Sequence, residues 1–202
     1  MITVRSKSRP ELLDRVESFG FVAFDNGDYD LNLIAERRLT NRKHNSFDDV
    51  FNIVYKIGDL WITESGACTT DPGRYWLTKE DYKGCAVYYH PQQARSAYRL
   101  GNHRGNPSHP ALLQKKAVKY WRDWDKDEQA EYEGEIHTGR IGLNIHRSST
   151  REGGSKFVEK WSAGCIVWQD SKDHLRMIEL CKLQRDKRGW HNFSFTLIPQ
   201  EV

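Results

Sequence analysis

Residues 51–63 read FNIVYKIGDLWIT, and this stretch contributes most to the expected fold. Apolar and polar residues alternate from Phe51 to Ile57, which is the period of a strand with one buried face. Gly58 and Asp59 favour a turn, and Leu60 to Thr63 supplies a returning strand. The stretch therefore predicts an antiparallel β-hairpin.

A second hairpin is predicted just before the first. Phe21 to Asp25 and Tyr29 to Ala35 are the expected strands. Asn26-Gly27 between them favours a type I′ turn, because both residues tolerate positive φ. Two consecutive hairpins favour an antiparallel sheet.

The rest of the chain adds strands and two helices. The helices are expected over Pro10 to Phe19 and from about Lys172 to Arg185. Further strands are expected at residues 74–77, 84–89, 117–124 and 193–197, with a short strand or turn at 111–114. The 202 residues show no clear linker, which predicts one domain over 1–202. Its expected class is α+β and β-rich, a mostly antiparallel sheet or sandwich, with 1–45 a peripheral helix and hairpin and 46–202 the core.

Charge and cysteine usage narrow the classes of function. The net charge is only +3, so no nucleic-acid partner is expected. No signal segment begins at Met1 and no apolar run could span a bilayer, so we expect synthesis in the cytoplasm, no stable membrane insertion and a monomer. The four cysteines show no CxxC spacing and are expected to be reduced.

An acidic stretch from Asp123 to Glu135 opens with aspartates at alternate positions, as a calcium loop does. The sixth position is Glu128 rather than glycine, and the twelfth is Gly134 rather than glutamate. We therefore expect a solvated loop, with no metal and no cofactor in the protein.

The candidate chemistry lies between Gly142 and Asp170. A short apolar run ends in His146, and a polar excursion leads to Ser162-Ala163-Gly164-Cys165. A thiol reacts as its thiolate and needs a nearby base, which His146 can supply. The N–H groups of Gly164 and Cys165 could stabilise an oxyanion, and Ser162 could hydrogen-bond in the same loop. The plainer alternative is that Gly164 and Cys165 only pack and that His146 is simply exposed.

The spacing of these residues resembles the signature of L,D-transpeptidase catalytic domains. That signature is a histidine followed, after a gap of comparable length, by Ser/Thr-His-Gly-Cys; here fifteen residues, Arg147 to Trp161, separate His146 from Ser162. The stretches Thr69–Tyr75 and Tyr98–Gly105 further resemble phage-encoded cell-wall lysis proteins, or endolysins.

The resemblance implies a β-rich L,D-transpeptidase-like fold and a cysteine that attacks a peptide carbonyl of peptidoglycan to give a thioester. Transfer to an amine gives a cross-link, and transfer to water gives endopeptidase or carboxypeptidase activity. Cys165 resembles the nucleophile, His146 its base, and Gly164 with Cys165 the oxyanion donors.

Two positions depart from the pattern. Ala163 replaces the second histidine of the signature, and Arg147 replaces a small residue. No acidic residue is obviously placed to orient His146, so we expect a backbone carbonyl in that role. Both departures favour hydrolysis over cross-linking.

Stem peptides carry carboxylates, which guanidinium groups bind in forked geometry. The candidate binding residues are Arg99, His103, Arg104 and Arg147, with Trp161 as a wall of the pocket. A solvated basic loop is the alternative for the arginines, and core packing for the tryptophan.

The resemblance thus implies a peptidoglycan peptide hydrolase that degrades the bacterial wall after membrane permeabilisation and acts in host lysis. The alternatives are an L,D-transpeptidase forming 3-3 cross-links, a cytoplasmic muropeptide L,D-carboxypeptidase, and a wall-binding domain without catalysis. A metallopeptidase would draw on His103, His109, His137 and His146, but no pair has HxxxH-like helical spacing.

Overall fold

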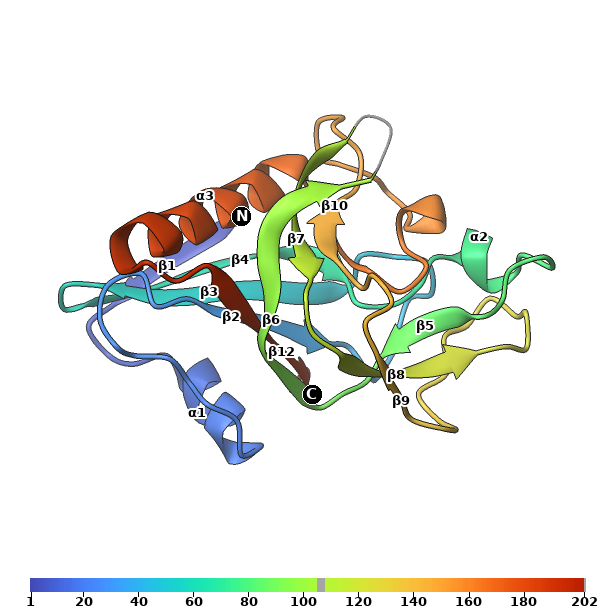
Figure 1. The fold of residues 1–202 in the computed structure, drawn as a ribbon, viewed down its shortest axis with the longest axis horizontal. Coiled ribbons are helices and arrows are strands. Elements are labelled where there is room, and N and C mark those ends of the chain that lie inside the picture. The colour runs from blue at the N-terminus through green and yellow to red at the C-terminus, as the bar shows by residue number, and fades with distance from the viewer. Residues whose placement is uncertain (105–107, 202) are drawn as a thin grey trace.

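The computed structural model describes residues 1–104 and 108–201, so Gly105, predicted above to belong to a motif, lies outside the described residues. The described part contains the following elements (Figure 1): β1 Ile2–Ser6, α1 Glu11–Ser18, β2 Asn32–Arg37, β3 Asp49–Ile57, β4 Leu60–Thr69, α2 Arg74–Leu77, β5 Cys85–Tyr88, β6 Gln92–His103, β7 His109–Gln114, β8 Val118–Asp123, β9 His137–Gly139, β10 Ile145–Arg147, the 3-10 helix η1 Glu159–Trp161, β11 Ile166–Trp168, α3 Ser171–Arg188 and β12 Asn192–Pro199.

The larger sheet closes on itself. Its strand order is β1-β4-β11-β10-β7-β6-β12-β2-β3, and β3 also pairs with β4. Of these nine strands β1 lies outside the ring, which leaves a closed barrel of eight. The fold is therefore β-rich α+β as expected, but the sandwich prediction is wrong. The closure comes from β4, which is long enough to pair with β3 along its length and with β11 through Cys68 and Thr69.

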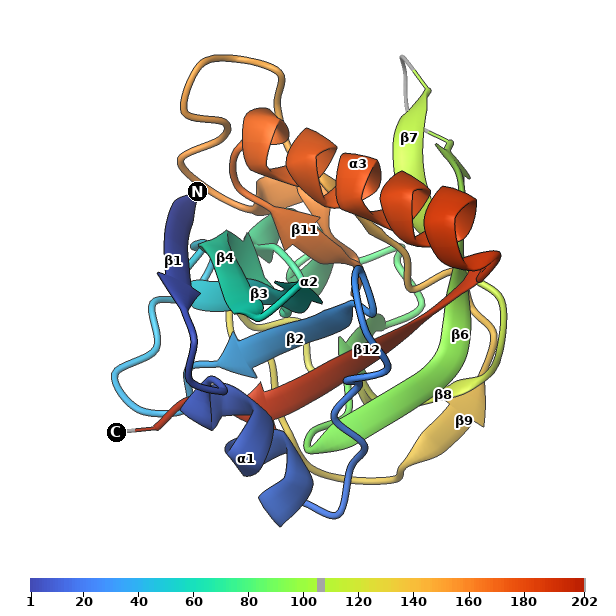
Figure 2. The same cartoon turned by 90° about the vertical axis from the view of Figure 1, so that its left-hand side faces the viewer.

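The barrel interior is aromatic. Phe51 and Trp168 have ring centroids 4.5 Å apart, and Phe195 packs on Phe51 at 5.7 Å. The helix α3 lies across β7, β10 and β11 (Figure 2), and its Met177, Ile178 and Cys181 belong to the same buried cluster. Burial of this apolar surface is the main source of stability.

The helix α3 ends as its sequence predicts. The Asp170 carboxylate caps its first turn by accepting a hydrogen bond from Lys172 N, and Gly189 ends it at φ 68°. The smaller sheet, β5-β8-β9, lies at the other end of the molecule from α3 (Figure 1). None of the helices in the described residues combines the length and apolar character needed to cross a membrane.

The hairpin predicted over Phe21–Ala35 does not form. The Asn32 side chain binds both backbone polar groups of Phe24, and the Asp30 carboxylate accepts from the backbone and side chain of Asn26. These side chains hold residues 21–30 as a loop. The strand β2 instead pairs with β3 and β12, so it belongs to the barrel and not to a peripheral hairpin.

The strand predicted at Arg74–Leu77 is also wrong, because the segment forms helix α2. Gly73 precedes it in an extended conformation, and Leu77 is buried with Cys85, Val87 and Trp121 of the smaller sheet. The helix docks on η1, next to the segment that leads to Cys165.

Candidate functional site

The strands β10 and β11 bring the two ends of the motif together. They pair in parallel, with His146 opposite Val167. Cys165 lies just before β11 and packs in a small cluster with Val167, Phe47 and Val158. The pairing therefore brings His146 opposite Val167, a member of the cluster against which Cys165 packs.

The loop that carries Cys165 is fixed on both sides. The carbonyl of Ser162 accepts from Gly73 N at 2.9 Å, and the carbonyl of Ala163 accepts from Ala86 N at 3.2 Å. Gly164 has φ 134°, and a Cβ there would lie 2.2 Å from the Ala86 carbonyl oxygen. Only glycine suits this position, which is a packing reason as well as a conformational one.

The hydroxyl of Ser162 closes the loop on itself. It donates to the Cys165 carbonyl at 2.7 Å and accepts from Gly164 N at 3.0 Å. The Gly164 N–H is therefore engaged in this conformation. The Cys165 N–H remains as the candidate oxyanion donor.

Cys165 is partly exposed, whereas the other three cysteines are buried. Its Sγ donates to the Gly142 carbonyl at 3.4 Å. Burial of the sulfur raises the pKa of the Cys165 thiol to about 11. The resting group is thus a thiol.

His146 is buried and neutral. Its Nδ1 lies 2.8 Å from the Arg147 carbonyl oxygen, which can only accept, so Nδ1 carries the proton and Nε2 carries the lone pair. This agrees with the expectation of a backbone carbonyl as the orienting group. Burial, and then the neighbouring His103, lower the pKa of His146 well below its usual value. Within residues 1–104 and 108–201, no hydrogen bond joins this ring to the Cys165 thiol.

Three further histidines surround His146. The His103 ring stacks on it with centroids 4.0 Å apart, and His109 lies at 5.8 Å. His174 of α3 approaches His109 at 6.3 Å. His137 lies elsewhere, stacked on Tyr120.

These rings pack against one another, and their nitrogens do not approach a common position where a metal ion could bind. In the described part of the chain, one group of three residues brings ligand atoms within 4.8 Å of one another, and it is Asp123, Asp125 and Glu131. The arrangement of these histidines therefore supports neither a histidine-bound metal ion nor the metallopeptidase alternative.

The candidate substrate-binding residues are spread around the site. His103 and Arg147 adjoin His146, and the Arg147 guanidinium donates to the Ser148 carbonyl. Arg104 is exposed beyond the end of β6, and Arg99 is exposed five residues earlier, within that strand. Trp161 is half-exposed and lines a cavity of about 700 Å³ with Arg151 and Phe157, in the loop between His146 and Cys165.

Sequence patterns missed two residues that shape the site. The Gln114 side chain accepts hydrogen bonds from three consecutive N–H groups, of Ile141, Gly142 and Leu143, and so holds the loop whose carbonyl receives the thiol. The Asn45 side chain accepts from Arg74 N and Glu159 N, and donates to the Glu159 carboxylate. Neither amide has a sequence signal, because each acts through contacts with distant segments.

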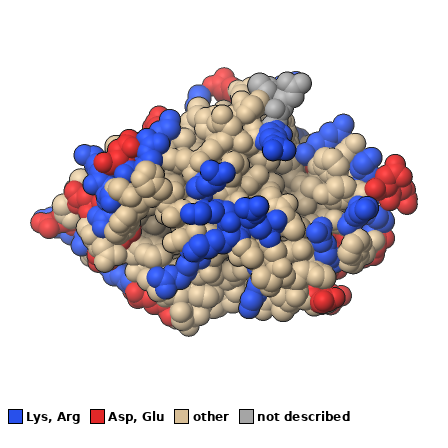
Figure 3. Space-filling view, in the orientation of Figure 1, with Lys and Arg blue, Asp and Glu red and all other residues tan. Residues whose placement is uncertain are grey.

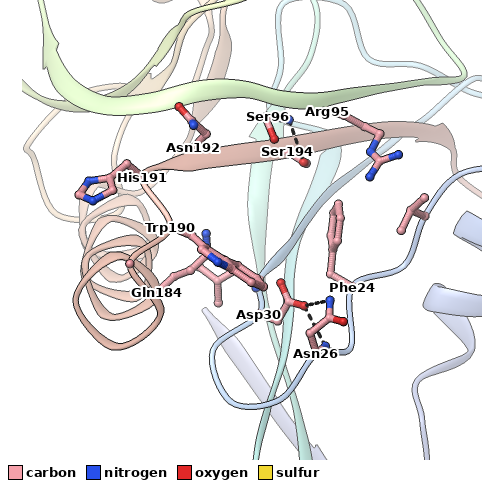
Figure 4. Close-up of a pocket in the computed structure, with 13 residues that line it drawn as sticks. Phe24, Asn26, Asp30, Arg95, Ser96, Gln184, Trp190, His191, Asn192 and Ser194 are labelled. Atoms are coloured by element: carbon pink, nitrogen blue, oxygen red, sulfur yellow. Dashed lines mark hydrogen bonds between the residues drawn. The ribbon is translucent and has the colours of Figure 1, made fainter.

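A second concavity lies away from these residues, between the end of α3 and strands β6 and β12. It has a volume of about 520 Å³ and is lined by Phe24, Arg95 and Trp190 among others (Figure 4). Lys and Arg side chains gather over the middle of the face that Figure 3 shows. Lys115 borders the cavity through its hydrogen bond to Asn192.

No protein-family model matches the chain, and neither the curated proteins nor the solved structures contain a match. Any assignment of function therefore depends on the residues and geometry described above.

Proposed function

We propose that the protein is a cysteine hydrolase of peptidoglycan stem peptides, with Cys165 as nucleophile and His146 as base. The observation that supports this proposal is the parallel pairing of β10 with β11, which brings His146 opposite Val167, a member of the cluster against which Cys165 packs. The one partly exposed cysteine and a neutral imidazole with a free Nε2 lone pair are the groups that a thioester mechanism needs.

The reaction would proceed in two steps. Cys165 Sγ attacks the peptide carbonyl carbon while its proton moves to His146 Nε2, and collapse breaks the C–N bond as the imidazolium protonates the leaving amine. Water then attacks the thioester with His146 as base, which releases a carboxylate and restores the thiol.

The pKa values of Cys165 and His146 bear on when the proton moves between them. The raised pKa of Cys165 and the lowered pKa of His146 both disfavour a resting thiolate–imidazolium pair. Proton transfer therefore accompanies the attack and does not precede it. A small movement of the His146 ring toward Cys165 on substrate binding is part of the proposal.

The anionic stem peptide would lie beside His146, along Arg147 and strand β6. Arg147 and His103 adjoin the imidazole, and Arg99 and Arg104 extend the basic surface along β6. Trp161 borders the cavity in the loop between His146 and Cys165, and it offers an apolar wall.

Purified sacculi and defined tetrapeptide muropeptides test the proposal. Wild type should release shortened or separated stem peptides, identified by mass spectrometry, and Cys165→Ala should release none. His146→Gln should lose about 10²- to 10⁴-fold in rate, the usual contribution of a general base. Thr150→Ala, at an exposed position of the same loop that does not line the cavity of Trp161, serves as the matched control and should retain activity.

The products also separate the alternatives. Loss of a terminal D-alanine indicates a carboxypeptidase, cut cross-bridges indicate an endopeptidase, and new 3-3 cross-links indicate a transpeptidase. Unchanged products with Cys165→Ala would end the proposal of a cysteine enzyme.

A wall-binding domain is the second candidate, and the concavity lined by Trp190 and Arg95 favours it (Figure 4). An aromatic ring beside polar and cationic groups suits a polymer of sugars and acidic peptides. On this reading Trp190→Ala would abolish co-sedimentation with sacculi, while Cys165→Ala would leave both binding and lysis unchanged.

A further inference from the structure

Three carboxylates that do not belong to the proposed catalytic site meet at the end of strand β8. Asp123 is the last residue of the strand, Asp125 follows after Trp124, and Glu131 returns to them from the following loop (the yellow segment beyond β8 in Figure 1). One oxygen from each of the three lies within 4.8 Å of the others.

The Asp123 carboxylate points to a missing partner. Asp123 is only 3% exposed, and its Oδ1 is buried without a hydrogen-bond partner. Its Oδ2 accepts a long hydrogen bond, 3.4 Å, from Glu131 N. A buried anionic oxygen without a donor costs free energy that a cation would offset.

The cationic side chains near this loop are engaged elsewhere. Lys126 donates to the Tyr82 carbonyl, Arg122 to the Gly84 carbonyl and Arg42 to the Ala130 carbonyl. Asp127 adds a further negative charge to the loop, and its carboxylate accepts from Gln129 N. The three carboxylates therefore lack a neutralising ion pair within the described residues.

We propose that Asp123, Asp125 and Glu131 bind one divalent cation, and that this cation is Ca²⁺. Three hard oxygen donors with no nitrogen or sulfur exclude a zinc-type ligand set. Carboxylates on an irregular loop suit the flexible, high coordination number of Ca²⁺ better than the rigid octahedron that Mg²⁺ requires.

The site differs from the calcium loop to which the sequence was compared above. Glu128 and Gly134 at positions six and twelve still exclude that loop, and Glu131, at position nine, is the residue that folds back onto Asp123. With Ca²⁺ bound, the loop from Asp123 to Glu135, which the sequence predicted to be solvated, would be ordered.

The cation would stabilise the smaller sheet, which supports the proposed active site. β8 pairs with β5, and Ala86 of β5 holds the Cys165 loop through its bond to Ala163. The loop after Glu131 also carries Tyr132, whose hydroxyl donates to Asp71 at 2.6 Å.

Terbium luminescence and calorimetry on the full chain test the site. Tb³⁺ bound there should be sensitised by Trp124, which lies between two of the ligands, and Ca²⁺ should displace it with a stoichiometry of one per chain. Asp125→Asn, an exposed position that spares the fold, should weaken binding at least about tenfold. Glu133→Gln, an exposed acid of the same loop outside the trio, should bind as wild type does.

Absence of Ca²⁺ binding to the wild type at about 10 mM, beyond the range of the weakest protein modules, would overturn the proposal. So would equal affinities of wild type and Asp125→Asn. The Ca²⁺-binding measurement on the wild type tests the proposal even if a variant fails to fold.

Discussion

Cys165 is the residue whose environment can be probed most directly. It is the partly exposed cysteine among four, yet its pKa is raised to about 11. Its alkylation by iodoacetamide should therefore increase about tenfold per pH unit from pH 7 to pH 10, because the thiolate fraction does so below the pKa. Peptide mapping by mass spectrometry should place the label on Cys165.

A rate that is already constant near neutral pH would contradict this expectation. It would show a thiolate preformed by His146, which the recorded geometry does not contain. The variant Cys165→Ser provides the background rate from the three buried thiols.

At this scale the sequence predicted that His146 and Cys165 lie at strand ends. The structure places Cys165 just before β11 but His146 in the middle of β10. The expected backbone carbonyl does accept a hydrogen bond from His146 Nδ1. The sequence could not predict that His109 and His174 would join His146. Their approach depends on the β6–β7 pairing of His103 with His109 and on the docking of α3.

Among the elements, α2 and η1 are joined to the preceding loop by one side chain. Asn45 makes three hydrogen bonds to Arg74 and Glu159 from a left-handed backbone conformation, φ 57°. Asn45→Ala should lower the free energy of unfolding by about 1–3 kcal/mol, since it leaves these groups without partners. Hydrogen exchange should accelerate over residues 159–165.

Asn41 offers the matched control. It also has a left-handed backbone, φ 52°, but is exposed. Asn41→Ala should therefore report only the backbone cost of alanine in that conformation. Equal effects of the two variants would show that the side chain of Asn45 does not hold the loop.

Elements with local signals were predicted, and those that depend on distant contacts were not. The β3–β4 hairpin follows from alternation around Gly58, and α3 follows from Asp170 and Gly189 at its ends. The Asn26-Gly27 turn failed because Asp30 and Asn32 bind the preceding backbone. Side chains here compete with a neighbouring strand for the backbone hydrogen-bonding groups, and a pattern of apolar residues does not reveal this competition.

For the molecule as a whole, the buried imidazoles predict sensitivity to acid. Burial, and then His109, lower the pKa of His174 to about 3, so below pH 6.5 the unfolded chain binds a proton that the folded chain does not. Stability from this group is present above about pH 6.5 and is lost as the pH falls toward 3. Burial lowers the pKa of His146 in the same direction.

Urea denaturation between pH 7 and pH 4 measures this effect. His174→Leu should reduce the slope of unfolding free energy against pH by about 1.4 kcal/mol per unit, the value for one proton. His44→Leu, at an exposed position, should leave the slope unchanged. An unchanged slope in His174→Leu would mean that His174 is protonated in the folded protein.

The barrel itself could not be predicted. Each hairpin has a local signal, but closure requires β12 to lie between β2 and β6, and β2 pairs with β12 in parallel over Leu33–Arg37 and Phe195–Pro199. A parallel pair has no connecting turn to mark it. A sandwich and a barrel therefore share the same list of expected strands.

That position of β12 sets an order on folding. The ring needs β12, at residues 192–199, to fill the gap between β2 and β6, which come earlier in the chain. While the ribosome still holds those residues, β2 and β6 present unpaired edges, which are sites of aggregation. The ring can be completed only after residues 192–199 have left the ribosome, so a shortened chain that stops before Asn192 should accumulate as insoluble material.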